Sequence, residues 1–539
     1  MPGLRDATFL GLILGGCVLV GSQLWWPTSA PQPKQYDTSA YQKLDHQLDE
    51  LFQAEWNEKK LQPAERADRL LICRRLALGL TGSVPSLEDI RTLERLPDAE
   101  RVPWYLEHLL ADRRSSDYLA ERFARTFVGT EDGPLILFRR RRFTNWIADE
   151  LQKNTPYDAL VRSILSERGL WTDKPSTNFF SVTAQADAKN QPDPVRLAGR
   201  VTRAFLGLRL DCAECHNHPF ASWKQTDFRG FAAFFGQTHI GFAGLYDGPG
   251  EYQVEDKLTK ELAPVPPAVP FAKELLPDTG ERRERLAAWV THPGNPYFAR
   301  AAVNRVWAIL FGTPLVSPID NLDPADNPSD RPTNLGDRVL GQLAREFTTH
   351  GYDLRWLIRT IASSRVYQLS SSAEFDITVY HEKSWAVYPL VRLRPEQVSG
   401  ATLQAASVRT LNAQTPIFLR LVRYAQENQF LKRYGDDGNS EFEEHGGTIT
   451  QRLILMNGQM VSEKINQSPL NSSTRIAWMA SDNSKAVEAA YLAALTRRPT
   501  TAESEHFLDF MKDDSLNRMQ KLEDIYWALV NSTEFAWGH

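Results

Sequence analysis

The feature that most constrains the fold is the spacing of apolar side chains along the 539 residues. Over most of the chain they recur every three or four positions, which places them on one face of an α-helix, whereas a strand requires alternation. Turn residues such as Gly82 and Pro85 separate successive stretches of this kind. We therefore predict a mainly α protein. The helical patterns cover 64–80, 100–112, 116–128, 139–152, 157–166, 194–207, 281–291, 296–311, 334–349, 353–364, 394–408, 448–465, 483–495, 501–513 and 516–532.

The pattern changes between Ile240 and Pro270, where turn residues and short alternating pieces replace the helical spacing. The segment APVPPAVP (263–270) resists both helix and strand interiors. A chain of this length also exceeds one ordinary core. We expect two helical lobes joined by a small irregular or β insertion and a Pro-rich linker. The predicted limits are 1–33 for a signal or membrane anchor, 34–245 for the first lobe, 246–280 for the linker and insertion, and 281–539 for the second lobe.

The N-terminal segment predicts export, because no charged side chain occurs between Asp6 and Lys34. Residues 7–26 are apolar-leaning, and a helix of this length spans about 30 Å, roughly one hydrocarbon core. Trp25 and Trp26 stand where an interfacial aromatic belt is expected. A retained anchor, a cleaved signal peptide and a lipoprotein signal ending at Cys17 all stay open. Each of them implies an exported protein, and we expect a periplasmic or cell-envelope location with residues 7–26 anchoring it to the cytoplasmic membrane.

Charge and common motifs exclude some classes of function. The formal net charge is -5, with a pI near 6.2, which gives the whole chain no electrostatic footprint for nucleic acid. We therefore expect no nucleic-acid partner. The sequence has no Gly-rich phosphate loop, no Gly-x-Ser-x-Gly elbow and no His-Glu-x-x-His motif, so it indicates no hydrolase. Whether the chain is an enzyme stays open.

The stretch DCAECHNHPF (211–220) contains the pattern Cys-x-x-Cys-His in a chain with only four cysteines. Cysteines three positions apart on a helix share a face and can form thioethers to the two vinyl groups of haem, and the next histidine can bind the iron. We predict haem c as a covalent cofactor, with Cys212 and Cys215 as its anchors and His216 as the proximal iron ligand. We expect His218 to lie beside the group, within reach of a propionate.

Two other interpretations of the motif stay open. Cys212 and Cys215 would form a disulfide readily outside the cytoplasm. Together with His216 and His218 they also offer zinc-ligand types, although the two histidines are too close in sequence to close a tetrahedral site easily. Cys73 lies in an apolar-periodic helix and is most simply a buried small hydrophobe.

Aromatic residues follow the motif and could cover a macrocycle, although the same spacing is more often that of an ordinary core. The iron's sixth ligand is not indicated. His239, Met456 and Met460 are candidates, and so is an open position. An open position would favour ligand binding or peroxide chemistry, whereas a Met or His there would favour electron transfer. The aromatic residues are Phe220, Trp223, Phe228, Phe231, Phe234 and Phe235.

Two charged stretches have both a functional and an ordinary interpretation. The four consecutive arginines at 139–142 could pair with haem propionates or an acidic partner, but such runs are usually solvated helix faces. Asp320, Asp323, Asp326 and Asp330 could bind calcium, but their Pro-containing steps indicate turns before the helix that begins near Asn334.

An ordered series of segments resembles a known pair of domains. RRLALGLTGSVPS (74–86), WIADELQKNTPYDALVRSIL (146–165) and CAECHNHPFASWKQTDFRGFAAFF (212–235) resemble a domain of unknown function abundant in planctomycetes and related bacteria. NPYFARAAVNRVWAILFGTPLVSPIDNLDP (295–324) and HGYDLRWLIRTIASSRVYQLSS (350–371) resemble its C-terminal companion domain, as do GTITQRLILMNGQMVSEKI (447–465), YLAALTRRPTTAE (491–503) and WALVNSTEF (527–535).

The resemblance implies an exported protein, often linked to a separate cytochrome c domain at its N-terminus. This chain departs from that arrangement, because no second Cys-x-x-Cys-His precedes residue 64. Any haem would therefore be attached at Cys212 and Cys215. The hypothesis is an exported, membrane-anchored haem c protein acting in electron transfer or as a redox subunit, with a redox protein as its partner. The alternative is a non-redox binding or structural protein of the cell envelope, in which the motif forms a disulfide or a metal site.

Overall fold

The computed structural model of the chain describes most residues from Ser39 to His539. The described residues belong to one compact unit that extends from Asp37 to His539. The predicted anchor at 7–26 lies outside them, and within them no helix combines the length and apolarity needed to cross a bilayer. The described ranges are 39–130, 140–184, 191–217, 223–255, 260–322, 334–411, 429–435, 442, 448–469, 471–513 and 515–539.

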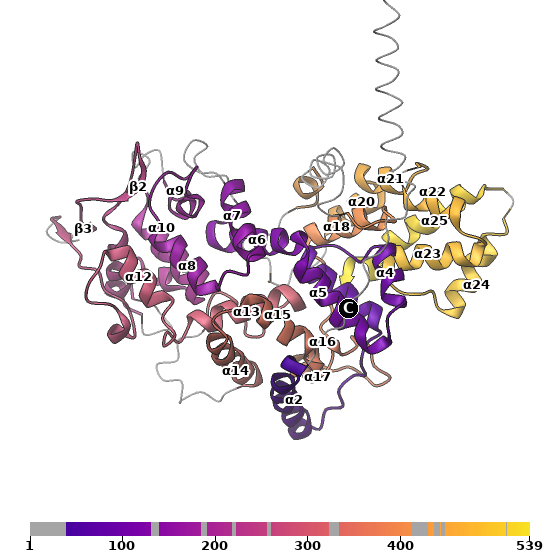
Figure 1. Ribbon diagram of the computed structural model, residues 1–539, viewed down its shortest axis with the longest axis horizontal. Coiled ribbons are helices and arrows are strands. Elements are labelled where there is room, and N and C mark those ends of the chain that lie inside the picture. Colours follow the sequence, from indigo (N-terminus) through magenta and orange to yellow (C-terminus); the bar gives the residue numbers. More distant parts are fainter. Residues whose placement is uncertain are drawn as a thin grey trace, which may run out of the picture. The chain divides into compact units, whose positions relative to one another are not determined.

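The N-terminal part of the unit is helical, as predicted (Figure 1). Local sequence signals set where several of these helices begin. The side chain of Asp68 accepts from the backbone N–H of Leu70, and Ser86 and Asp89 form a reciprocal capping box. The helices are α2 (Ser39–Lys59), α3 (Arg69–Thr81), α4 (Leu87–Glu94), α5 (Asp98–Ala111), α6 (Arg113–Val128), α7 (Arg140–Gln152), α8 (Tyr157–Ser166), the short η1 (Pro175–Thr177) and α9 (Asn178–Ser181).

The middle of the chain contains the predicted small β insertion. β1 (Thr238–Gly241) pairs antiparallel with β2 (Gly244–Asp247), and β3 (Gln253–Glu255) pairs with β4 (Leu262–Pro264). Arg283 fixes the first hairpin, since its guanidinium donates to both carboxylate oxygens of Asp247 at 2.7 and 2.8 Å. The surrounding helices are α10 (Pro194–Val201), the π-helical η2 (Thr202–Leu206), η3 (Leu210–Ala213), α11 (Gln225–Ala232), η4 (Ala233–Phe235) and η5 (Lys273–Leu275).

The C-terminal part is again helical, which confirms the mainly α fold class. One small sheet joins β5 (Val391–Arg392) to β6 (Trp537–Gly538). The helices are α12 (Arg282–Val290), α13 (Phe298–Phe311), α14 (Leu335–Thr349), α15 (Leu354–Ser363), α16 (Arg365–Gln368), α17 (Val379–Lys383), α18 (Pro395–Ala405), α20 (Ile449–Asn457), α21 (Gln459–Ile465), α22 (Ser472–Met479), α23 (Asn483–Leu495), α24 (Thr501–Phe510), α25 (Arg518–Val530) and η7 (Glu534–Ala536).

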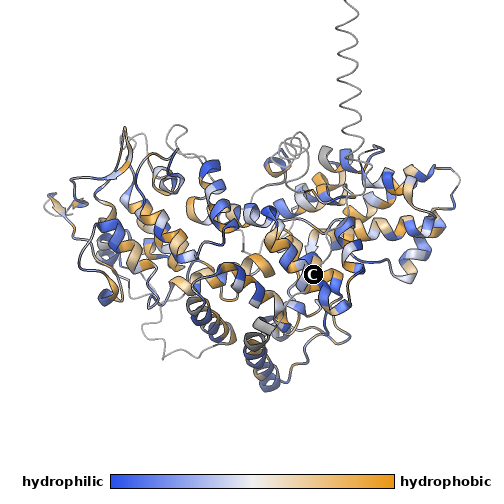
Figure 2. Cartoon of the chain, in the orientation of Figure 1, coloured by the Kyte–Doolittle hydropathy of each residue, from blue (hydrophilic) through white to orange (hydrophobic). Residues whose placement is uncertain are grey.

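Two hydrophobic clusters hold these elements together. The larger one contains residues from Leu48 to Tyr388 together with Leu492, and α13 lies within it with almost every side chain buried. The smaller one is built from residues after 392 together with Leu78 and Val84 from the region of α3. Figure 2 shows the apolar stripes of the helices that supply these clusters. Helices on both sides of the predicted linker therefore contribute to the same core. The domain limits stay a prediction that rests on the sequence alone.

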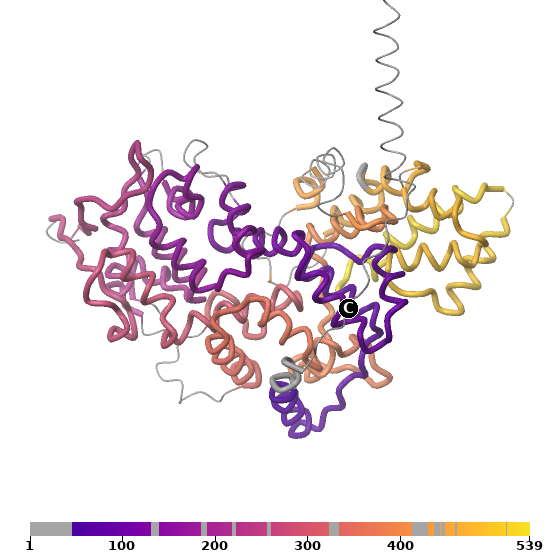
Figure 3. Tube along the Cα trace, in the orientation of Figure 1, coloured from indigo at the N-terminus to yellow at the C-terminus, as the bar shows by residue number. Residues whose placement is uncertain are grey.

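Helix α3 connects distant parts of the chain through two buried arginines. Arg74 donates to the carbonyl oxygens of Ala494 and Phe535, at 3.0 and 3.4 Å. Arg75 donates to the carbonyl oxygen of Leu369 at 2.7 Å, and its guanidinium lies 3.5 Å from the ring centre of Tyr388. The trace in Figure 3 accordingly brings the indigo N-terminal helices beside the yellow C-terminal ones.

Candidate functional site

The cysteine motif lies on a short loop between α10 and α11. The predicted helix over 194–207 forms, but its last turn widens into the π-helical η2 and ends at Gly207, which has a left-handed backbone (φ 62°). A Cβ at Gly207 would lie 3.1 Å from a methyl carbon of Leu322, so both space and backbone favour glycine there. Leu210 and Ala213, which flank Cys212, are fully buried and anchor the loop in the core.

The motif does not lie on a regular α-helix, which differs from the helical geometry on which its interpretation was based. Cys212 belongs to the single 3₁₀ turn of η3, and Glu214 continues with right-handed helical angles (φ −60°, ψ −47°). The turn η3 ends at Ala213, so Cys215 follows it in the loop, three positions after Cys212. Both thiols are unpaired and both residues are exposed, so no disulfide joins them in this structure.

His216 is exposed, and one of its ring nitrogens already has a partner. Its Nδ1 lies 2.7 Å from the carbonyl oxygen of Asn217. Because a carbonyl only accepts, Nδ1 must carry the proton, and the neutral ring keeps the Nε2 lone pair for a metal. The Asn217 side chain in turn accepts from the backbone N–H of Gln225 at 3.0 Å, which ties the motif to the start of α11. His218 lies outside the described residues.

Four charged side chains brace the loop. Arg203 donates to both carboxylate oxygens of Asp211 at 3.0 and 2.6 Å, and Arg209 donates to Asp320 at 3.0 Å. A third contact of 3.5 Å joins Arg203 to Asp320. Burial by itself lowers the pKa of Arg203, but Asp211 and Asp320 outweigh it, so this pKa lies above its ordinary value. Sequence reasoning missed this network, because Asp320 is far from the motif in the chain.

Asp320 is the one described aspartate of the Asp-rich stretch, and its contacts do not support the interpretation of this stretch as a calcium site. Asp320 is held by the guanidinium groups of Arg203 and Arg209. Among the described residues no group of three or more His, Cys, Asp or Glu side chains could hold a metal ion. Asp323, Asp326 and Asp330 lie outside the described residues.

The aromatic residues after the motif belong to the core, which favours their ordinary interpretation. The ring of Phe231 packs 6.0 Å from Trp289, and the ring of Phe235 packs 6.2 Å from Phe180. Trp223, Phe228 and Phe234 are buried as well, and Phe220 lies outside the described residues.

The candidates for a sixth ligand lie on several elements. His239 is in β1, where its Nε2 is 3.1 Å from the carbonyl oxygen of Pro249 and its ring packs on Tyr246. Met456 is in α20, and Met460 is in α21, where its side chain is not described. No contact of the described residues selects one of them.

The arginine run is partly an ion-pair site between helices. Arg140 donates to both oxygens of Glu121 at 2.9 and 2.8 Å and so joins α7 to α6. Arg142 donates to the carbonyl oxygen of Thr172 at 2.6 Å. Arg139 lies outside the described residues. A purely solvated face is therefore too simple an interpretation for Arg140.

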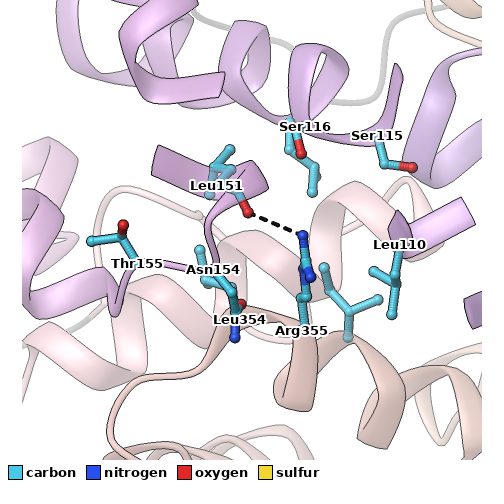
Figure 4. A pocket seen from close by; sticks show the side chains of 10 residues that line it. Leu110, Ser115, Ser116, Leu151, Asn154, Thr155, Leu354 and Arg355 are labelled. Atoms are coloured by element: carbon cyan, nitrogen blue, oxygen red, sulfur yellow. Dashed lines mark hydrogen bonds between the residues drawn. The ribbon is translucent and has the colours of Figure 1, made fainter. Parts of the chain in front are cut away.

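Figure 4 shows a small pocket that is lined by residues of α5, α6, α7 and α15 and by none of the motif. Its volume of about 20 Å³ suits a water molecule and is far too small for a haem. Arg355 crosses it and donates to the carbonyl oxygens of Leu151 and Gln152 at 3.5 and 2.9 Å, which caps the end of α7. The lining residues are Leu110, Ser115, Ser116, Leu119, Leu151, Asn154, Thr155, Leu354, Arg355 and Ile358.

Fold and site together define a mainly helical protein with an exposed Cys-x-x-Cys-His loop between two helices of its first half. The family model PSCyt2, described as a protein of unknown function (DUF1549), matches residues 47–240. The model PSD1, described as a protein of unknown function (DUF1553), matches residues 282–439. Both domains of the pair are therefore present in this chain, in the order that its motifs indicated. Comparison with the curated proteins and with the solved structures gave no match.

Proposed function

We propose that this protein is an exported haem c protein that acts in electron transfer or as a redox subunit of the cell envelope. The observation that carries the proposal is the state of the motif. Cys212 and Cys215 are unpaired, exposed and three positions apart on one short loop, and His216 has Nδ1 engaged and Nε2 available. The name of the family model PSCyt2 is consistent with a cytochrome association.

The residues of the loop suit covalent attachment. Cys212 and Cys215 would each supply a thiol whose sulfur would bond to one vinyl carbon while its hydrogen passed to the other, so the attachment would consume no oxidant. His216 would bind the iron through Nε2, and the carbonyl of Asn217 would orient the ring and raise its basicity by accepting from Nδ1. The bound group would supply a one-electron couple. His218 is proposed as a neighbour of the propionates.

The location and partners follow from the N-terminal sequence and the charge. We propose that residues 7–26 either anchor the protein to the cytoplasmic membrane or direct its export, which places the motif where c-type haem is attached. A redox protein is the expected partner. The net charge of -5 supports no role in binding nucleic acid.

The test is expression in a host with active cytochrome c maturation, followed by haem staining after denaturing electrophoresis. We expect the wild-type chain to retain stain and the Cys212→Ala/Cys215→Ala double variant to lose it. Cys73→Ala is the matched control, because Cys73 is buried in α3, and it should stain like the wild type. His216→Ala should keep the stain while its iron spectrum changes.

A colourless wild-type chain would contradict the proposal, provided that the same host matures a control cytochrome. The alternative class would then be the better account, namely a non-redox binding or structural protein of the envelope. Thiol titration and metal analysis of the same preparation would decide whether Cys212 and Cys215 form a disulfide or hold a metal.

A further inference from the structure

We infer that Asp320, which belongs to the companion domain, is a positioning residue for the cysteine loop of the first domain. The attachment loop is then complete only when both family domains are present. This inference rests on the proposed function, because it assigns to Asp320 a role in presenting Cys212 and Cys215 to a haem.

Ion pairs hold Asp211 and Arg209, two charged residues that precede Cys212. Asp211 is held by Arg203 through two hydrogen bonds, and Arg209 is held by Asp320 through contacts of 3.0 and 2.8 Å. The 3.5 Å contact between Arg203 and Asp320 closes the network. Asp320 therefore touches both arginines, one of which fixes the residue directly before Cys212.

The segment that carries Asp320 is itself firmly placed. The Asn304 side chain binds both the N–H and the carbonyl of Val316, at 3.0 and 2.7 Å. Farther along, the N–H of Leu322 donates to the carbonyl of Gly207 at 2.7 Å, and the Leu322 side chain is buried against that glycine. The carboxylate of Asp320 thus lies on a segment of the second domain that hydrogen bonds hold on both sides of it, at Val316 and Leu322.

A second contact from the companion domain fixes the turn that leads into the motif. Arg305, in α13, donates to the carbonyl oxygen of Ala204 at 2.6 Å. Ala204 is in the π-helical η2, where the wide turn leaves the regular backbone pattern. The approach to the motif is therefore held by Arg305 and Leu322, and Asp320 holds the two arginines, Arg203 and Arg209, that lie just before it.

The exposure of these side chains indicates that their ion pairs can position the loop without adding much to the stability of the fold. The side chains of Arg203, Arg209 and Asp320 are 43, 35 and 20% exposed. Ion pairs as accessible as these contribute little to the stability of a large fold. Loss of the Asp320 carboxylate should therefore leave the melting temperature almost unchanged, while the loop samples more conformations.

The first experiment needs no haem. The full chain is purified from a host without cytochrome c maturation, and the alkylation rates of Cys212 and Cys215 by iodoacetamide are followed by peptide mass spectrometry. We expect Asp320→Asn to change these rates by about threefold or more. Asp320→Glu, which keeps the carboxylate, should return them toward the wild-type values. Asp149→Asn is the control, since it removes a more exposed ion pair, with Arg113, on other helices.

The second experiment uses the loaded protein and counts thioether bonds per haem. In Asp320→Asn we expect a larger fraction with only one bond, at an unchanged melting temperature. Unchanged alkylation rates in Asp320→Asn would overturn the inference, and so would a fall of several degrees in its melting temperature. If the rates change but the wild-type chain never acquires haem, Asp320 still positions the loop and the proposed function fails by itself.

Discussion

Gly400 of α18 lies directly on the backbone of Gly82, the residue that ends α3. A Cβ at position 400 would be 2.2 Å from the carbonyl oxygen of Gly82. Nearby, the Ser83 hydroxyl donates to the carbonyl of Gly400 at 3.1 Å, and Gln397 donates to the carbonyl of Leu78 at 3.0 Å. The segment 74–86, one of those that carried the family resemblance, is thus the surface on which the companion domain packs.

This contact predicts an unusual response to a Gly→Ala change. In a helix interior the change normally stabilises by about 1 kcal/mol. In Gly400→Ala the new methyl meets a backbone atom that cannot rotate away, so we expect a loss of about 2 kcal/mol or more. Denaturant unfolding of both proteins measures the difference.

Gly341 in α14 provides the control. A Cβ there would meet only the ends of the Arg300 and Arg345 side chains, at 3.4 and 3.6 Å, and these are flexible. Gly341→Ala should therefore leave stability unchanged or raise it. Equal effects of the two changes would contradict the close packing of α18 on α3.

Low pH should destabilise the C-terminal part of the protein, because it protonates the carboxylates that pair with Arg497. This residue donates to both Glu503 and Glu534. Hydrogen bonds from Arg497 lower the pKa of Glu503 to about 2, and for Glu534 they outweigh the opposing effect of burial and also lower its pKa to about 2. Because these values lie below those of the unfolded chain, the contribution is complete above about pH 4.5 and is lost as the pH falls toward 2.

We expect Arg497→Met to lose about 1–2 kcal/mol at pH 7, since the carboxylates are partly exposed and solvent screens them. Its melting temperature should also fall less than that of the wild type between pH 5 and pH 3. Thermal unfolding followed by circular dichroism at several pH values tests both points. Parallel pH curves for the two proteins would show that the network does not titrate as described.

Among the described residues, the alkylation rates of the thiols should distinguish the buried Cys73 from the exposed Cys212 and Cys215. Burial raises the pKa of the Cys73 thiol and also blocks access, whereas Cys212 and Cys215 are exposed. In native protein without haem we expect alkylation of Cys212 and Cys215 within minutes and of Cys73 only after unfolding. Peptide mass spectrometry measures each site, and rapid labelling of Cys73 would be inconsistent with its place in the core.

Much of the helical fold was predictable because its signal is local. The predicted helices over 157–166 and 483–495 agree with α8 and α23 at both ends. The predicted helix over 448–465 was wrong in one respect, since it divides into α20 and α21 at Gly458. That glycine has an extended backbone (φ −70°, ψ 142°). The spacing of the apolar residues does not change at the break, so it gave no indication that a helix ends there.

The site was predictable only in part, because only residues that lie close together in the sequence form a recognisable pattern. Cys212, Cys215 and His216 lie within five residues, so their chemistry is visible in the sequence. The partner of Arg209 lies 111 residues away at Asp320, and no local pattern indicates such a pair. The sequence interpretation also assumed a regular α-helix for the motif, whereas Gly207 ends the preceding helix and Cys212 lies in a short 3₁₀ turn with the buried Leu210 and Ala213.

The most direct test of the proposed function is the reduced pyridine haemochrome spectrum of the exported protein. Saturated vinyl groups shift the α band to shorter wavelength, so its position counts thioether bonds. We predict the position of a haem with two thioethers for the wild type, and of one thioether for Cys212→Ala and for Cys215→Ala. A wild-type spectrum with no haem band, or a band at the position of unattached haem, would contradict the account.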